Sequence, residues 1–135
     1  MKIKTIIGSI AILLLLASCM GSPTVWDTSV PENRLTTVRF YSMIVESYNG
    51  IDVTKFSNVQ IPAGQTRING EVHVYHAGVN FRLSGMEFAY NFEAGKIYNV
   101  QGAAQDMVWG VSVSEMEGSR RSFTTFVPFR DQPVF

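Results

Sequence analysis

Cysteine is nearly absent from this sequence, with Cys19 as the one example in 135 residues. A single thiol cannot form an internal disulfide, so the folded chain has to be stabilised by packing. Charged residues are also sparse, at 16% of the chain, and Arg120 and Arg121 form the only adjacent basic pair. Because a nucleic-acid-binding surface needs clustered Lys and Arg, the composition predicts no nucleic-acid partner.

Histidine and the common catalytic motifs are equally scarce. His73 and His76 are the only histidines, and residues three apart on a strand point to opposite faces, away from a shared metal ion. No Gly-x-Ser-x-Gly motif and no phosphate-binding glycine loop occurs, which argues against the usual hydrolase and nucleotide sites. Glu115 and Glu117 share a strand face at best, whereas paired glycosidase acids face each other across a cleft. The sequence therefore predicts a protein without enzymatic activity, cofactor or metal.

Long apolar runs are missing except at the start of the chain. Residues 6–16 are apolar apart from Gly8 and Ser9, follow Lys2 and Lys4, and precede small residues. Charged, apolar and small residues in that order are typical of a secretory signal. A membrane-spanning helix needs roughly 20 apolar residues, and this run is shorter. We expect residues 1–18 to be a signal peptide that is removed.

The end of this run, Leu-Ala-Ser-Cys at residues 16–19, resembles a bacterial lipobox. The resemblance implies that the thiol of Cys19 receives diacylglycerol and that Cys19 becomes the first mature residue. Two acyl chains hold a protein on a membrane stably, whereas one binds reversibly. The alternative is an ordinary signal peptide with Cys19 close to its cleavage site. Met20 stands where an Asp would retain a Gram-negative lipoprotein in the inner membrane, so the resemblance implies a bacterial envelope protein anchored in the outer membrane.

The chain from Cys19 onward is long enough for one domain. Without Lys2 and Lys4 it has nine basic side chains (11 − 2) against eleven acidic ones, and is mildly acidic. Residues 19–30 begin with small and polar residues broken by Pro23, which predicts a lipidated tether. Trp26 either packs on the domain edge or touches the membrane interface. Residues 31–135 form the expected domain.

The domain has the texture of β-strands. Residues 35–45 are rich in Thr, Val, Phe, Tyr and Ile, and Asn49-Gly50 is a strong hairpin turn that leads to a partner strand near Ile51. Residues 65–75 alternate with period two. The predicted core face of that strand consists of Thr66, Ile68, Gly70, Val72 and Val74.

The alternation resumes over residues 79–92, where its parity changes at Ser84-Gly85, a change that predicts a β-bulge. Strands are also expected at 58–61, at 96–101 and 107–115 on either side of a small-residue break at 102–104, and at 122–129. Pro128 places the last strand at an edge or an end. These features predict an all-β fold, a single antiparallel β-sandwich of about seven strands, Ig-like or transthyretin-like.

Two turn motifs support the same fold by resemblance. Ala94-Gly95-Lys96 with Tyr98, and Pro62-Ala63-Gly64, resemble the turns of small bacterial lipoproteins with β-sandwich domains and of PEGA-type surface domains. In those families such turns are structural. The resemblance thus implies a fold and an envelope location, with no catalytic residue.

Exposed aromatic residues are the remaining binding feature. Tyr75 falls on the polar face of its strand, and Tyr41, Tyr98 and Trp109 include at least one further candidate for exposure. Such rings stack on sugars or hold peptides. We therefore expect a non-catalytic binding or scaffolding role, with the membrane contacted through the lipid anchor and an envelope protein or glycan as partner. The alternatives are a small envelope hydrolase and, because the chain ends in Phe135, a small outer-membrane barrel.

Overall fold

The structure is a computed structural model that describes residues 24–25, 29–53 and 58–133. The predictions for the signal peptide, for the lipid attachment at Cys19, for Trp26 and for Phe135 lie outside the described residues. The described part holds ten strands and the short 3-10 helix η1 (Glu32–Arg34). The strands are β1 (Thr24–Val25), β2 (Leu35–Tyr41), β3 (Met43–Tyr48), β4 (Ile51–Asp52), β5 (Asn58–Pro62), β6 (Gly64–His76), β7 (Val79–Phe92), β8 (Ile97–Gln105), β9 (Val108–Glu117) and β10 (Arg120–Pro128).

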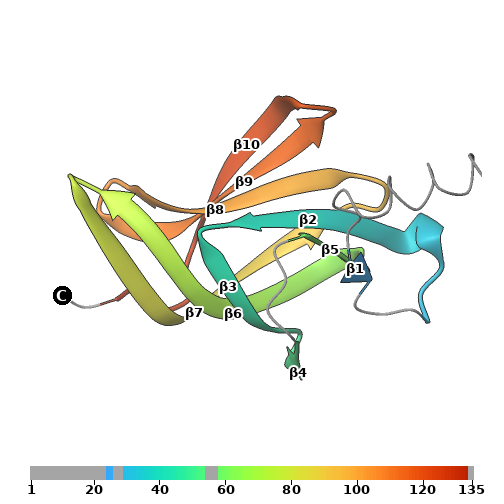
Figure 1. The fold of residues 1–135 in the computed structure, drawn as a ribbon, viewed down its shortest axis with the longest axis horizontal. Coiled ribbons are helices and arrows are strands. Elements are labelled where there is room, and N and C mark those ends of the chain that lie inside the picture. Colours follow the sequence, from blue (N-terminus) through green and yellow to red (C-terminus); the bar gives the residue numbers. More distant parts are fainter. Residues whose placement is uncertain (1–23, 26–28, 54–57, 134–135) are drawn as a thin grey trace, which may run out of the picture.

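The strands form two open sheets that pack face to face (Figure 1). One has the order β1-β5-β2-β8-β9-β10, and the other has the order β4-β3-β6-β7. The predicted all-β sandwich is confirmed. Eight of the strands have five or more residues, close to the predicted seven.

The larger sheet is mixed, which corrects the prediction of a purely antiparallel sandwich. β2 and β8 pair in parallel, with Thr37 opposite Ile97 and Tyr41 opposite Gln101. β1 and β5 are also parallel. Period-two alternation shows which face of a strand is buried. The alternation is the same whether the neighbouring strand runs parallel or antiparallel, so the sequence does not predict this parallel pairing.

A single corner residue divides the predicted strand 35–45 into two. Ser42 has a φ of +54°, and the chain passes there from β2 in one sheet to β3 in the other. The carbonyl of Ser42 accepts a hydrogen bond from the N–H of His73 at 2.8 Å, which fixes the corner against β6. Because Phe40 and Met43 are both buried on either side of the corner, the composition reads as one continuous strand.

The predicted turn and bulge are confirmed. Asn49 and Gly50 both have positive φ, +49° and +77°, as a type I′ turn requires, and Ile51 pairs with Tyr48. In the β6–β7 ladder the register shifts opposite Ser84 and Gly85, and Gly85 has a φ of +68°. Among the described strands, β10 pairs with β9 alone, so Pro128 lies on an edge strand.

The small residues at 102–104 do not break a strand, which corrects that prediction. β8 continues through them to Gln105, and the chain turns at Asp106 and Met107, with φ of +52° and +64°. A Cβ on Gly102 would lie 2.5 Å from the Val72 side chain and 2.7 Å from the carbonyl oxygen of His73. The two sheets approach each other closely at this point. Glycine fits there because it has no side chain to occupy the space between them.

The core lies between the sheets. On β6 the alternation places Thr66, Ile68, Val72 and Val74 inside, as predicted, each at most 2% exposed. At the end of the core near the β7–β8 connection, the rings of Phe92 and Tyr98 meet edge to face with centroids 5.0 Å apart. The cluster consists of Val38, Phe40, Met43, Val45, Tyr48, Val59, Ile61, Ile68, Val72, Val74, Leu83, Phe88, Phe92, Tyr98, Val100, Val111, Val113 and Phe129.

Candidate functional site

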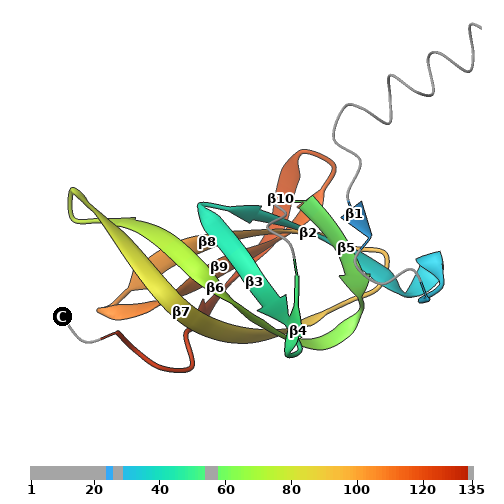
Figure 2. The same ribbon diagram turned by 60° about the horizontal axis from the view of Figure 1, so that its bottom comes forward.

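Two hairpin tips project from one end of the sandwich, one from each sheet. The β6–β7 and β8–β9 hairpins both end there, at the left in Figures 1 and 2. They carry four exposed large apolar side chains, which we call the tip surface: Tyr75 (72% exposed), Val79 (50%), Met107 (91%) and Val108 (38%). Exposed apolar side chains scattered singly are ordinary, whereas a group at one end of a domain is typical of an interaction surface.

Both tips are two-residue turns with left-handed backbone. Ala77 and Gly78 have φ of +52° and +78°, and Asp106 and Met107 have +52° and +64°. Left-handed backbone at both central positions is typical of type I′ hairpins and suits Asn, Asp and Gly. Met107 is none of these, and a non-glycine residue held there costs about 1 kcal/mol or more. The turn thus holds a flexible apolar side chain in an unfavourable backbone position at its apex.

Trp109 connects the two hairpins behind the tip surface. Its ring lies 4.9 Å from that of Phe81 and 5.7 Å from that of His76, both edge to face. Phe81 and His76 belong to the β6–β7 hairpin and Trp109 to the β8–β9 hairpin. The tip surface therefore rests on aromatic contacts between the sheets.

The four aromatic side chains considered for exposure differ in how far they are buried. Tyr75 is exposed as predicted, and of the other three candidates Tyr41 is 47% exposed, Trp109 is partly buried and Tyr98 is buried at 2%. The sequence did not reveal Met107 or Val108 as surface residues, because the strand was expected to begin at Met107. Nor does a sequence pattern show that two hairpins from different sheets end at the same end of the sandwich.

The histidines have separate surroundings. His73 Nε2 lies 3.8 Å from Glu71 Oε2, whereas the His76 ring contacts Trp109. Glu71 also binds Arg82 across the β6–β7 ladder, and this hydrogen bond is the main cause that lowers the pKa of Glu71. Within the described residues, no three His, Cys, Asp or Glu side chains gather closely enough to hold a metal ion.

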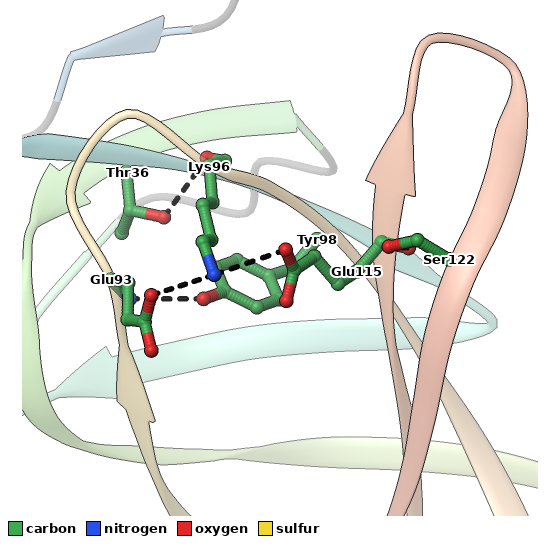
Figure 3. A network of polar contacts seen from close by, with 6 residues as sticks. All are labelled: Thr36, Glu93, Lys96, Tyr98, Glu115 and Ser122. Atoms are coloured by element: carbon green, nitrogen blue, oxygen red, sulfur yellow. Dashed lines mark hydrogen bonds and ion pairs between the residues drawn. The ribbon is translucent and has the colours of Figure 1, made fainter.

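A group of ionisable side chains surrounds Lys96 (Figure 3), close to the β7–β8 connection at the end of the sandwich opposite the hairpin tips (Figure 1). Lys96 Nζ lies 2.6 Å from Glu93 Oε2 and 3.1 Å from Glu115 Oε1. Hydrogen bonds to these two carboxylates, first to Glu93, raise the pKa of Lys96. The amine is thus protonated at neutral pH and is a poor nucleophile. Glu115, one of the acids weighed for glycoside hydrolysis, is engaged by the same amine.

Two further contacts in Figure 3 hold the β7–β8 connection in place, and a third, from the Ser122 hydroxyl to the carbonyl of Glu115 at 3.3 Å, joins β10 to β9. The Thr36 hydroxyl donates to the carbonyl of Lys96 at 3.2 Å, and the N–H of Glu93 donates to the Tyr98 hydroxyl at 3.0 Å. Burial is the main cause that raises the pKa of Tyr98. Since each of these contacts joins neighbouring strands or turns, the group around Lys96 is structural.

Comparisons with protein-family models, with curated proteins and with solved structures find no match for this chain. The resemblance to envelope lipoproteins therefore stays a prediction, as do the Ig-like and transthyretin-like topologies. In the part of the chain that the structure describes, no helix has the length and apolarity to span a membrane.

Proposed function

We propose that this protein is a lipid-anchored bacterial envelope protein that binds a partner protein, without catalysis, through the tip surface. The observation that carries the proposal is that the two hairpin tips at one end of the sandwich carry the exposed apolar side chains of Tyr75, Val79, Met107 and Val108. Aromatic residues and Met are enriched in the central parts of protein interfaces. Burying one such side chain contributes about 1.5–3 kcal/mol, so two or three of them supply a specific contact.

The position of β1 supports a tip surface that faces away from the membrane. β1 lies at the end of the sandwich opposite the hairpin tips, at the right in Figures 1 and 2. Thr24 follows the proposed lipidated Cys19 by five residues (24 − 19). A fully extended chain of that length spans at most about 18 Å. With Cys19 in the bilayer, the β1 end faces the membrane and the tip surface faces away from it.

Charge at the apex favours a protein over a second lipid surface as the partner. Asp106 is exposed and sits next to Met107 in the turn. A carboxylate carried into the hydrocarbon with Met107 would lose its hydration, which is costly. In a protein interface the same carboxylate stays at the polar rim around a small apolar centre.

Site-specific photo-crosslinking in intact cells tests the proposal. A photoreactive residue at Met107 should give a discrete protein adduct, and Tyr75→Ser should abolish it. The purified partner should then bind the full chain in detergent and should lose at least tenfold in affinity with Tyr75→Ser. The matched control position is Phe123, which is apolar and 60% exposed on β10. Equal adducts from positions 107 and 123, or a partner indifferent to Tyr75→Ser, would refute the tip surface as the binding site.

The anchor is tested separately. Cys19→Ala should remove the protein from the membrane fraction after a salt wash, or should leave it unprocessed with its signal peptide. Quantitative membrane association of a processed Cys19→Ala protein would refute the anchor while leaving the tip surface to be judged by crosslinking.

A further inference from the structure

A polar groove lies on the outer face of the larger sheet, away from the tip surface. Its volume is about 410 Å³, and it crosses β2, β8, β9 and β10. The residues that line it are Tyr41, Ser42, Asn99, Gln101, Ser112, Ser114 and Arg121. The volume falls within the range of small-molecule sites, about 300–1,000 Å³.

Strand register brings these side chains together. Asn99 pairs with Ser114 and Gln101 with Ser112 across β8 and β9, and Tyr41 is opposite Gln101 across β2 and β8. Paired residues point to the same face of a sheet. The intervening residues of β8 and β9 are apolar and buried in the core, so the alternation that builds the core also produces a polar outer face.

The lining consists mainly of side chains that form hydrogen bonds. It holds two amides, three hydroxyls of serine, an exposed tyrosine ring, one guanidinium and no carboxylate. The Oδ1 atom of Asn99 is buried and has no hydrogen-bond partner among the described residues. A buried polar atom left without a partner is destabilising. A ligand that draws the Asn99 amide toward itself removes that cost.

We propose that this groove binds a saccharide that carries a carboxylate. Sugar hydroxyls both donate and accept hydrogen bonds, as do the amides of Asn99 and Gln101 together with the hydroxyls of Ser42 and Ser112. The hydroxyl of Ser114 is buried and bonds Thr124. The apolar face of a sugar ring packs on an aromatic ring, which Tyr41 supplies at 47% exposure. The guanidinium of Arg121 provides several N–H donors for a carboxylate. No acidic residue lines the groove, so no carboxylate of the lining repels that of the ligand. This site is independent of the tip surface and of the proposed partner protein.

Calorimetric titration of the full chain, in a detergent without a sugar headgroup, tests the site. The probe is a trisaccharide of galacturonic acid, and the comparison is the neutral trisaccharide of galactose. The acidic sugar should bind at least tenfold more tightly, because hydrogen bonds to a charged group contribute about 1.5–3 kcal/mol. Arg121→Gln should abolish this preference. Tyr41→Ala should weaken both sugars by a similar factor.

Arg120 provides the matched control, because it is the adjacent cation and does not line the groove. Arg120→Gln should leave the preference for the acidic sugar unchanged, and thermal unfolding should show that each variant is folded. Two results would overturn the proposal: no heat from either sugar at millimolar concentration, or equal effects of Arg120→Gln and Arg121→Gln. Tyr75→Ser should not alter sugar binding, so failure of the groove and failure of the tip surface are distinguishable.

Discussion

The side-chain amide of Gln132 bonds with both of its ends to the backbone of Trp109. Gln132 Oε1 accepts a hydrogen bond from the Trp109 N–H, and Gln132 Nε2 donates to the Trp109 carbonyl, each at 2.8 Å. The amide thereby imitates the pairing of a neighbouring strand residue. Since Trp109 contacts Phe81 and His76, a residue beyond the last strand helps to fix the base of both hairpin tips.

Gln132→Ala should destabilise the protein by about 1 kcal/mol, because the N–H of Trp109 loses its bond to Gln132 and the carbonyl of Trp109 retains the N–H of Phe129 as its donor. The shift in the midpoint of thermal unfolding measures this change. In a Trp26→Phe background, the near-UV signal of Trp109 should also weaken as its ring loses order. Gln105→Ala, an exposed glutamine on β8, serves as the control. An unchanged midpoint and an unchanged Trp109 signal would show that the amide has no such role.

Gly102→Ala should destabilise the sandwich by about 1–3 kcal/mol, since the new methyl group overpacks a site where the sheets are in close contact. The carbonyl of His73 is backbone and cannot rotate away as a side chain does. Denaturant unfolding measures the change in free energy. Ala103→Ser alters the next residue, which belongs to the opposite face of β8, and should change stability by less than about 0.5 kcal/mol. Similar losses for both variants would contradict the close approach.

Met107→Gly should separate stability from binding. The substitution creates an Asp-Gly pair, which suits a type I′ turn, so the free energy of unfolding should stay the same or rise by up to about 1 kcal/mol. Affinity for the crosslinked partner should fall at least tenfold, because the most exposed apolar side chain of the tip surface is lost. Thermal unfolding and titration with the purified partner provide the two measurements. A variant that loses stability would contradict the strained turn.

The ion pair of Glu71 with Arg82 should contribute to the pH dependence of stability. The pKa of Glu71 is lowered in the folded chain, mainly by the hydrogen bond from Arg82. Its contribution is therefore present above the unfolded pKa, about 4.3, and is lost as pH falls through the lower folded value. The difference in unfolding midpoint between the parent and Arg82→Gln should shrink from pH 6 to pH 3. His73 is present in both proteins, and the exposed position of Arg82 keeps the effect small. A difference that grows toward pH 3 would contradict the assignment.

Local patterns predicted the local structure well. The alternation over residues 65–75 identified the buried face of β6, because side chains two apart on a strand share a face. Asn49-Gly50 identified its turn, because few other pairs accept two left-handed residues. The corner at Ser42 escaped prediction, since one left-handed serine leaves no trace in composition. The parallel pairing of β2 and β8 also escaped it, because pairing depends on contacts between distant segments.

For the candidate sites too, local features could be predicted from the sequence, whereas features that depend on distant segments could not. Tyr75 was predicted to be exposed from its place in the alternation, and it is. Tyr75 and Met107 come to the same end of the sandwich, and Tyr41 and Arg121 come to line one groove, only when strands from separate parts of the chain are assembled. Cys19 was read from a motif of adjacent residues, and it stays a prediction because it lies outside the described residues.

The course of β6 along the long axis has a mechanical consequence. β6 starts at Gly64, near the β1 end, and reaches the hairpin tip at His76, paired with β7 along almost its whole length. A pull between a membrane at Cys19 and a partner at the tip surface would act along these strands. Because β6 and β7 are joined at the tip, such a pull moves both in the same direction. The ladder hydrogen bonds between β6 and β3 would then bear the force together in shear, whereas a pull across the strands would open them one at a time. If the proposed anchor and partner hold the domain at its two ends, this arrangement of strands opposes stretching between them.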